Sequence, residues 1–99
     1  MPREQSLVTK IQNALKSEYP GECWLYKTDG NAAKNGAPDI IGVVCGVFIG
    51  LEVKTLKGRV RKNQEVQMAR IRKAGGRACV VRCVGDALWS VGMWTGFRE

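Results

Sequence analysis

Three charged residues bracket an apolar stretch in the middle of the chain. Asp39 precedes the apolar run 40–51, and Glu52 and Lys54 follow it. Side chains of a strand alternate between the two faces of a sheet, so Glu52 and Lys54 point the same way and Val53 points opposite. Two carboxylates beside a lysine are residue types that bind a divalent cation and activate water against a phosphodiester. The spacing therefore indicates a candidate metal-dependent hydrolytic site.

A turn around Gly46 is the element that must bring these groups together. The apolar run breaks at Cys45-Gly46 and then resumes, which predicts an antiparallel hairpin with strands near 39–45 and 47–54. Strands that are apolar on both faces are usually central and covered on both sides. A buried acid or lysine is costly there unless it is paired or metal-bound. An ion pair of Lys54 with Glu52 or Asp39 is the structural alternative to a metal site.

The N-terminal segment predicts an amphipathic helix over 4–18, because its apolar residues share one face and Pro20-Gly21 ends it. Glu4 falls on the same inward stripe. This acid either complements the helix dipole in the first turn or reaches the metal site from the start of the helix.

A strand over 23–28 should follow, since the segment is rich in aromatic and β-favouring residues. The polar loop 29–38 then leads directly to the candidate site. Basic and amide side chains in or next to this loop either touch phosphate or belong to an ordinary connection; they are Lys27, Lys34 and Asn35.

A second helix is predicted from about Lys62 or Asn63 to Lys73, where Gly75-Gly76 ends it. Its first turn contains Gln64, whose amide either holds a phosphate oxygen or the attacking water, or is solvated. The residues expected to face the sheet are Val66, Met68, Ala69 and Ile71. A strand over 78–84 comes next.

The chain should close with a short helix that has Asp86 as its N-cap. An apolar cluster near the C-terminus serves the core or a dimer contact, and stacking on bases is the rival use. Its members are Leu88, Trp89, Val91, Met93, Trp94 and Phe97.

Basic residues are concentrated downstream of the hairpin. The segment 54–82 holds ten Lys or Arg and one acid, Glu65, within a chain of formal net charge +7. A one-sided basic segment is the electrostatic footprint of a nucleic-acid binder, although a solvated basic face has the same composition. The residues predicted to contact nucleic acid are Lys34, Lys57, Arg59, Arg61 and Lys62.

The remaining composition excludes several classes of protein. No segment approaches the ~20 apolar residues of a membrane span, and the N-terminus lacks the hydrophobic core of a signal peptide. The four cysteines form no CxxC pair and there is no histidine, which disfavours zinc and favours buried, reduced thiols. We therefore expect one cytoplasmic domain over 1–99.

Several motifs together resemble the PD-(D/E)XK nuclease superfamily. They are Gly36-Ala37-Pro38-Asp39, then Glu52-Val53-Lys54-Thr55 at a strand end, Lys57-Gly58, and Gln64 in the following helix. Within that superfamily the chain looks like a stand-alone VRR-NUC domain, similar to archaeal and phage Holliday-junction resolvases. The resemblance covers nearly the whole chain and implies an α/β fold. Its restriction-endonuclease-like core has the order α-β-β-β-α-β-α, with a mixed central sheet flanked by helices.

The resemblance also implies residue roles. Asp39 and Glu52, with the backbone carbonyl of Val53, would bind Mg²⁺ or Mn²⁺, and Glu4 would contact the metal from the first helix. Lys54 would position or activate the attacking water, as a general base or as a cationic clamp, and Gln64 matches a site glutamine. One departure concerns the helix cap, because Arg61-Lys62-Asn63 stands where relatives often carry a capping serine.

The function predicted on this basis is that of a metal-dependent DNA endonuclease. The resemblance implies a homodimer that acts on branched DNA such as four-way (Holliday) junctions, and a phage or bacterial origin. The alternative is a non-catalytic basic module that binds nucleic acid. A sequence-specific restriction enzyme fits less well, since so small a chain has little room to read bases.

Overall fold

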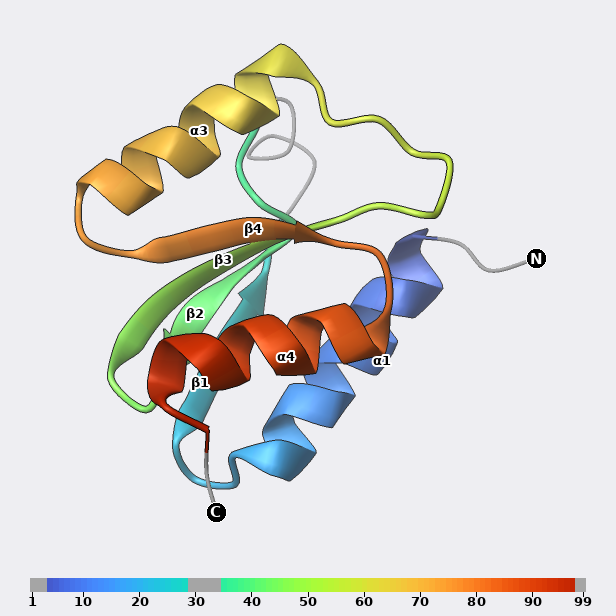
Figure 1. Ribbon diagram of the computed structural model, residues 1–99. Coiled ribbons are helices and arrows are strands. Elements are labelled where there is room, and N and C mark those ends of the chain that lie inside the picture. Colours follow the sequence, from blue (N-terminus) through green and yellow to red (C-terminus); the bar gives the residue numbers. More distant parts are fainter. Residues whose placement is uncertain (1–3, 29–34, 98–99) are drawn as a thin grey trace.

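The computed structural model describes residues 4–28 and 35–97, which build a four-stranded sheet with helices on both faces (Figure 1). The elements in chain order are α1 (Glu4–Glu18), β1 (Cys23–Lys27), β2 (Ile40–Val44), β3 (Val47–Val53), α3 (Lys62–Lys73), β4 (Arg77–Val81) and α4 (Val84–Thr95). This confirms the predicted order of elements and the α/β class.

The sheet is mixed, with the strand order β1-β2-β3-β4. The first three strands are antiparallel neighbours, and β4 runs parallel to β3. Parallel neighbours need a crossover connection, which the segment containing α3 supplies. Since β2 and β3 are flanked on both sides, the hairpin that carries the candidate site forms the centre of the sheet.

A two-residue turn sets the register of this hairpin. Val44 pairs with Val47, and the residues between them, Cys45 and Gly46, have φ angles of 50° and 82°. Positive φ at both central positions is the type I′ geometry, whose twist matches that of the flanking strands. The predicted turn at Cys45-Gly46 is therefore present, and it fixes which residues of the two strands lie opposite each other.

The two faces of the sheet have different covers (Figure 1). Helices α1 and α4 pack together on one face, where Ile49, Leu51 and Val53 of β3 enter the hydrophobic core. Helix α3 lies on the other face, over β3 and β4. An added Cβ on Gly50 would meet Ile71 of α3 at 3.3 Å, so the even-numbered positions of β3 face this helix. Glu52 is the next such position.

The inward face of α3 differs from the prediction. Gln64 and Met68 are buried and Ile71 is half-buried, which is the i, i+4, i+7 spacing of one helix face. Val66 and Ala69, predicted to face the sheet, are exposed instead. The prediction grouped apolar side chains and so missed that a glutamine occupies the first inward position.

The start of α4 is also corrected. Cys83 is the N-cap, and its Sγ accepts from the Asp86 backbone N–H at 3.4 Å. Asp86 lies within the first turn, where its Oδ2 accepts from the Arg82 backbone N–H at 2.9 Å. The carboxylate thus satisfies a donor before the helix, although Asp86 is not the cap.

Within the described residues, no helix has the length and apolarity needed to cross a bilayer.

Gly36 fixes the approach of the chain to β2. Its φ is +86°, and an added Cβ would lie 2.4 Å from the backbone oxygen of Asn63, at the start of α3. Only a glycine permits this contact between the two backbones. The contact seats the segment before Asp39 against the end of α3 that carries Gln64.

Replacing Gly36 by alanine should therefore destabilise the protein more than the same change at Gly46. Gly46 has a similar φ of +82° but open space around it. We expect Gly46→Ala to cost about 1 kcal/mol from the backbone conformation alone. Gly36→Ala should cost about 2 kcal/mol more from the steric overlap. Urea unfolding of both variants measures the difference, and equal costs would show that the Gly36 contact is unimportant.

Candidate metal and hydrolytic site

Asp39 is held at the entrance of β2, opposite Glu52. Ile40 pairs with Leu51, and the next step of the same register places Asp39 across from Glu52. The Asp39 Oδ2 atom accepts from the backbone N–H of Val53 at 2.8 Å. Its backbone oxygen accepts from the Thr28 N–H at 3.0 Å. Asp39 is thereby tied to the strands on both sides of it.

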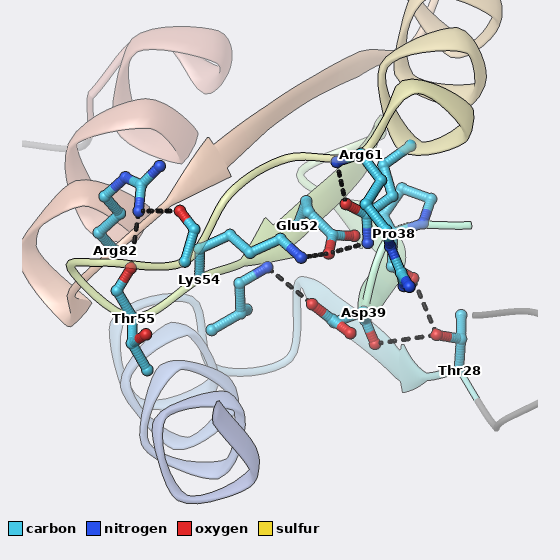
Figure 2. A network of polar contacts seen from close by, with 11 residues as sticks. Thr28, Pro38, Asp39, Glu52, Lys54, Thr55, Arg61 and Arg82 are labelled. Carbon is cyan, nitrogen blue, oxygen red and sulfur yellow. Dashed lines mark hydrogen bonds and ion pairs between the residues drawn. The ribbon is translucent and has the colours of Figure 1, made fainter. Parts of the chain in front are cut away.

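Glu52 is the most buried charged residue of the site, with 2% of its surface exposed. Its Oε2 atom accepts from Gln64 Nε2 at 2.8 Å and lies 3.4 Å from Lys54 Nζ. Its Oε1 atom is buried without a hydrogen-bond partner among the described residues. Figure 2 shows Asp39, Glu52 and Lys54 close together at the end of the hairpin. The prediction that the hairpin gathers these three side chains is confirmed.

Burial raises the pKa of Glu52 from 4.5 to about 7. The neighbouring Asp39 carboxylate adds to the rise, and the Lys54 ammonium opposes it. Desolvation disfavours a charged carboxylate, and a second carboxylate disfavours it further. One lysine therefore does not compensate for two acids in this environment, and the site favours additional positive charge.

Gln64 joins the start of α3 to Glu52. Its Oε1 atom accepts from the Arg61 backbone N–H at 2.8 Å, while its Nε2 atom donates to Glu52. Arg61 makes no side-chain cap, and the bond that Gln64 accepts is the half of a capping box in which the N3 side chain serves the backbone N–H of the N-cap residue. The amide is buried and engaged at both ends, which makes Gln64 a residue that orients Glu52.

The donor set fits a hard divalent cation. Asp39 and Glu52 supply carboxylate oxygens, and the unpartnered Oε1 of Glu52 is the kind of buried atom that a cation would satisfy. The Val53 carbonyl leaves its strand on the same side as the Val53 N–H, which points to Asp39.

Glu4 is not brought to this site. It is exposed in the first turn of α1, and not on the inward stripe where the sequence placed it. Within 4–28 and 35–97, no three acids, cysteines or histidines are clustered as metal ligands. The buried residues of α1 are Val8, Ile11 and Leu15, so the part of the helix that faces the core begins one turn after Glu4.

Comparison of the structure with solved proteins identifies the fold. One similar chain, described as "VRR_NUC domain", has a TM-score of 0.65 and 21% identity over 87% of this chain and 95% of its own. Another, a "VRR_NUC domain protein", has a TM-score of 0.66 and 12% identity over 92% of this chain and 89% of its own. The chain has the VRR-NUC fold. Neither a family model nor a curated protein matches the sequence.

A basic loop follows the site in this VRR-NUC fold, between β3 and α3. It exposes Lys57, Arg59 and Arg61, and Lys62 is exposed at the start of α3. These four residues were predicted to contact nucleic acid, and all are accessible to a phosphate backbone. Lys34, the fifth, lies outside the described residues.

Arg82, at the end of β4, holds this loop and was missed by the sequence analysis. Its Nη1 atom donates to the backbone oxygens of Thr55 at 2.6 Å and Gly58 at 2.8 Å (Figure 2). An added Cβ on Gly58 would lie 3.3 Å from the Lys54 Cδ, so the same loop packs on the stem of the site lysine. Only a spatial contact between residues 27 positions apart reveals this role.

The cysteines differ in part from expectation. Cys23, Cys45 and Cys79 are half-buried, and all four thiols are free. Cys83 is exposed, so the prediction of burial is wrong for it, because it caps a helix at the surface. Burial raises the pKa of the Cys23 and Cys79 thiols, which keeps both in the less reactive protonated form.

The raised pKa of Glu52 predicts a pH-dependent stability for the metal-free protein. Between pH 4.5 and about 7 the folded chain retains a proton that the unfolded chain releases, so the free energy of unfolding should fall as pH rises through this range. The full effect is about 3 kcal/mol. Glu52→Gln should remove it and be more stable than the parent at pH 8. Urea unfolding in EDTA from pH 4 to pH 8 measures both, and a difference between the two proteins that does not change with pH would contradict the account.

The Arg82 contacts predict a loop that loosens when the guanidinium is removed. In Arg82→Met, trypsin should cleave after Lys57 and Arg59 at least about 5-fold faster. The reason is that the loop unfolds locally more often once its charge-assisted hydrogen bonds are lost. Arg77→Met is the matched control, because Arg77 is exposed at the start of the same strand. Mass spectrometry of the first fragments gives the rates. Equal rates in the two variants would show that Arg82 does not hold the loop.

Proposed function

We propose that residues 1–99 form a single VRR-NUC nuclease domain that hydrolyses phosphodiester bonds of DNA with Mg²⁺ or Mn²⁺. The observation that carries the proposal is the buried Glu52 carboxylate, which lies beside Asp39 and has one oxygen that no described residue hydrogen-bonds. Such a carboxylate is costly in an apolar interior unless a cation completes it. The basic loop next to it supplies charges suited to a phosphate backbone.

Asp39, Glu52 and the Val53 carbonyl are the groups that would hold the cation. When bound, a divalent cation lowers the pKa of water and stabilises the negative charge that develops on phosphorus. Asp39 is oriented for this role by the Val53 N–H, and Glu52 by Gln64. The hairpin and α3 therefore set both carboxylates before any ligand arrives, which limits the reorganisation that binding requires.

Lys54 is the residue that faces the reacting phosphate in this proposal. It is 7% exposed, and it follows Glu52 on the same face of β3. Its ammonium would donate to the attacking water or to the phosphate oxygens. Glu52 Oε2 lies 3.4 Å from its Nζ, and the loop at Gly58 packs on its stem. Gln64 acts through Glu52 and is a positioning residue.

The proposal also specifies the oligomeric state and the substrate: a homodimer that acts on branched DNA, such as four-way junctions. A two-fold dimer matches the two symmetric cut sites of such a junction. The exposed apolar side chains of α4 and the segment after it support a contact between copies; they are Trp89, Met93 and Phe97.

The second candidate is a basic module that binds nucleic acid without cutting it. The 3.4 Å contact between Lys54 and Glu52 favours it, since an ion pair could serve the fold alone. Its weakness is the second acid, Asp39, which raises the cost of burying Glu52.

Cleavage assays on labelled four-way junctions, flaps and plain duplex separate the candidates. The protein should cut with Mg²⁺ or Mn²⁺ and not with EDTA, and should prefer branched substrates. Asp39→Asn, Glu52→Gln and Lys54→Ala should each lower the rate at least about 100-fold while binding survives, because each removes stabilisation made at the reacting phosphate. Lys16→Ala, on the exposed surface of α1, is the control and should cut normally. Binding of DNA without cleavage in either Mg²⁺ or Mn²⁺ would contradict the proposal and favour the binding module.

A further inference from the structure

The half of the sheet that α3 leaves open carries exposed apolar side chains. Trp24 and Tyr26 of β1 are 61% and 50% exposed, and Val43 and Phe48 on the neighbouring strands are 39% and 40% exposed. Trp24 pairs with Val43, and Val43 with Phe48, so these side chains share one face. An exposed apolar surface of this kind marks a binding site more often than chance.

The two aromatic rings lie nearly parallel to each other and form an exposed pair, here called the platform. Trp24 and Tyr26 stack with their ring centroids 6.2 Å apart and an interplanar angle of 9°. They lie two residues apart on one strand, so both project from the same side of the sheet. The distance between the two ring centroids is close to the rise between alternate residues of a strand, which is about 6.8 Å. An extended chain of nucleotides can follow such a row.

This platform is continuous with the candidate site. Position 28 continues the side of β1 that carries Trp24 and Tyr26, and the Thr28 N–H donates to the Asp39 backbone oxygen. Asp39 lies across from Glu52 on the face that meets α3. The open face therefore leads from Trp24 through Tyr26 to Thr28, and from there across β2 to the two carboxylates.

The charge around the platform suits a nucleic acid. Lys27, one residue after Tyr26, projects from the opposite face of the sheet, where its Nζ donates to Gln5 Oε1 of α1 at 2.7 Å, so it does not supply this charge. The basic residues Lys57, Arg59 and Arg61 lie beyond the carboxylates, on the loop that enters α3. Base–aromatic stacking tolerates any sequence and is worth about 1–3 kcal/mol per base.

We propose that Trp24 and Tyr26 stack on unpaired bases of DNA next to the phosphate held at Asp39 and Glu52. This rests on the proposed nuclease function and adds the class of substrate: DNA with unpaired nucleotides beside the cut. Bases in a duplex are already stacked on each other, so only an unpaired strand can present a base face to a surface aromatic.

The binding test compares two strands in EDTA, where no cutting occurs. The probes are a fluorescent 12-mer of thymidylate and the same strand with abasic sites in place of its bases. The parent protein should bind the thymidylate strand at least about 5-fold more tightly than the abasic strand, measured by fluorescence anisotropy. Trp24→Ala should abolish this preference and leave the abasic strand bound as before.

Two further variants keep the result interpretable. Trp89 of α4, on the other face of the sheet, is also 61% exposed and contacts an aromatic ring, so Trp89→Ala is the matched control. Each copy of this variant should keep the preference for thymidylate whether or not the copies associate. Trp24→Phe retains a stacking ring and should restore most of it. The salt dependence of binding should be the same in the parent and in Trp24→Ala, because phosphate contacts, not stacking, set that slope.

Cleavage of a flap substrate gives an independent readout. An abasic site in the unpaired strand beside the cut should lower kcat/KM for the parent and have little effect in Trp24→Ala, which shows that the base and the ring act on each other. Equal effects of Trp24→Ala and Trp89→Ala, or an unchanged preference for thymidylate in Trp24→Ala, would overturn the proposal. A dimer that dissociates in Trp24→Ala with strand binding intact would overturn it too, in favour of a contact between copies. Because the binding assay contains no metal, a protein that stacks bases but cuts nothing would reject the nuclease function separately.

Discussion

The burial of one carboxylate constrains most of this structure. Glu52 lies on the central strand β3, between an antiparallel neighbour and a parallel one, and is 2% exposed. A charged group in this position costs several kcal/mol unless it is paired, hydrogen-bonded or metal-bound. The chain supplies a lysine and a glutamine to one oxygen and nothing among the described residues to the other. That asymmetry is the physical basis for the proposed cation site.

The surrounding elements orient this carboxylate and its neighbour. The two-residue turn at Cys45-Gly46 determines that Asp39, and not the residue before or after it, lies across from Glu52. A slip of one residue would move every side chain of the strand to the other face of the sheet. Helix α3 contributes Gln64, and Gly36 brings the two backbones close enough for the helix to reach. The arrangement is thus set by close contacts between backbones as much as by the acids themselves.

The two halves of the same sheet face differ in what covers them. Over β3 and β4, α3 covers the surface and encloses the carboxylates. Over β1 and β2, no described helix covers this face, and the aromatic pair of Trp24 and Tyr26 is exposed. A nuclease that cuts beside unpaired nucleotides needs both a dry, charged site for the phosphate and an accessible apolar surface for bases. In the proposed function, one half-covered sheet provides both.

The sequence by itself determined the order of elements, the hairpin and the meeting of Asp39, Glu52 and Lys54. These follow from local rules: the alternation of side chains along a strand, the periodicity of a helix and the preference of a tight turn for Gly. It also indicated that Gln64 belongs near the site, through a family resemblance. It failed where apolarity was a poor guide to burial, at Val66 and Ala69, and where a cysteine took the capping role assigned to Asp86.

Tertiary structure alone decided which groups complete the site. The sequence placed Glu4 on an inward stripe, yet α1 exposes its first turn, and no local pattern reports where a helix end projects. Arg82 reaches the loop after Lys54 from the end of a strand far along the chain. Trp24 and Tyr26 are exposed because α3 packs over β3 and β4. Each depends on how elements pack across the sheet. Periodicity predicts a side chain's own face, but only the assembled fold decides what that face meets.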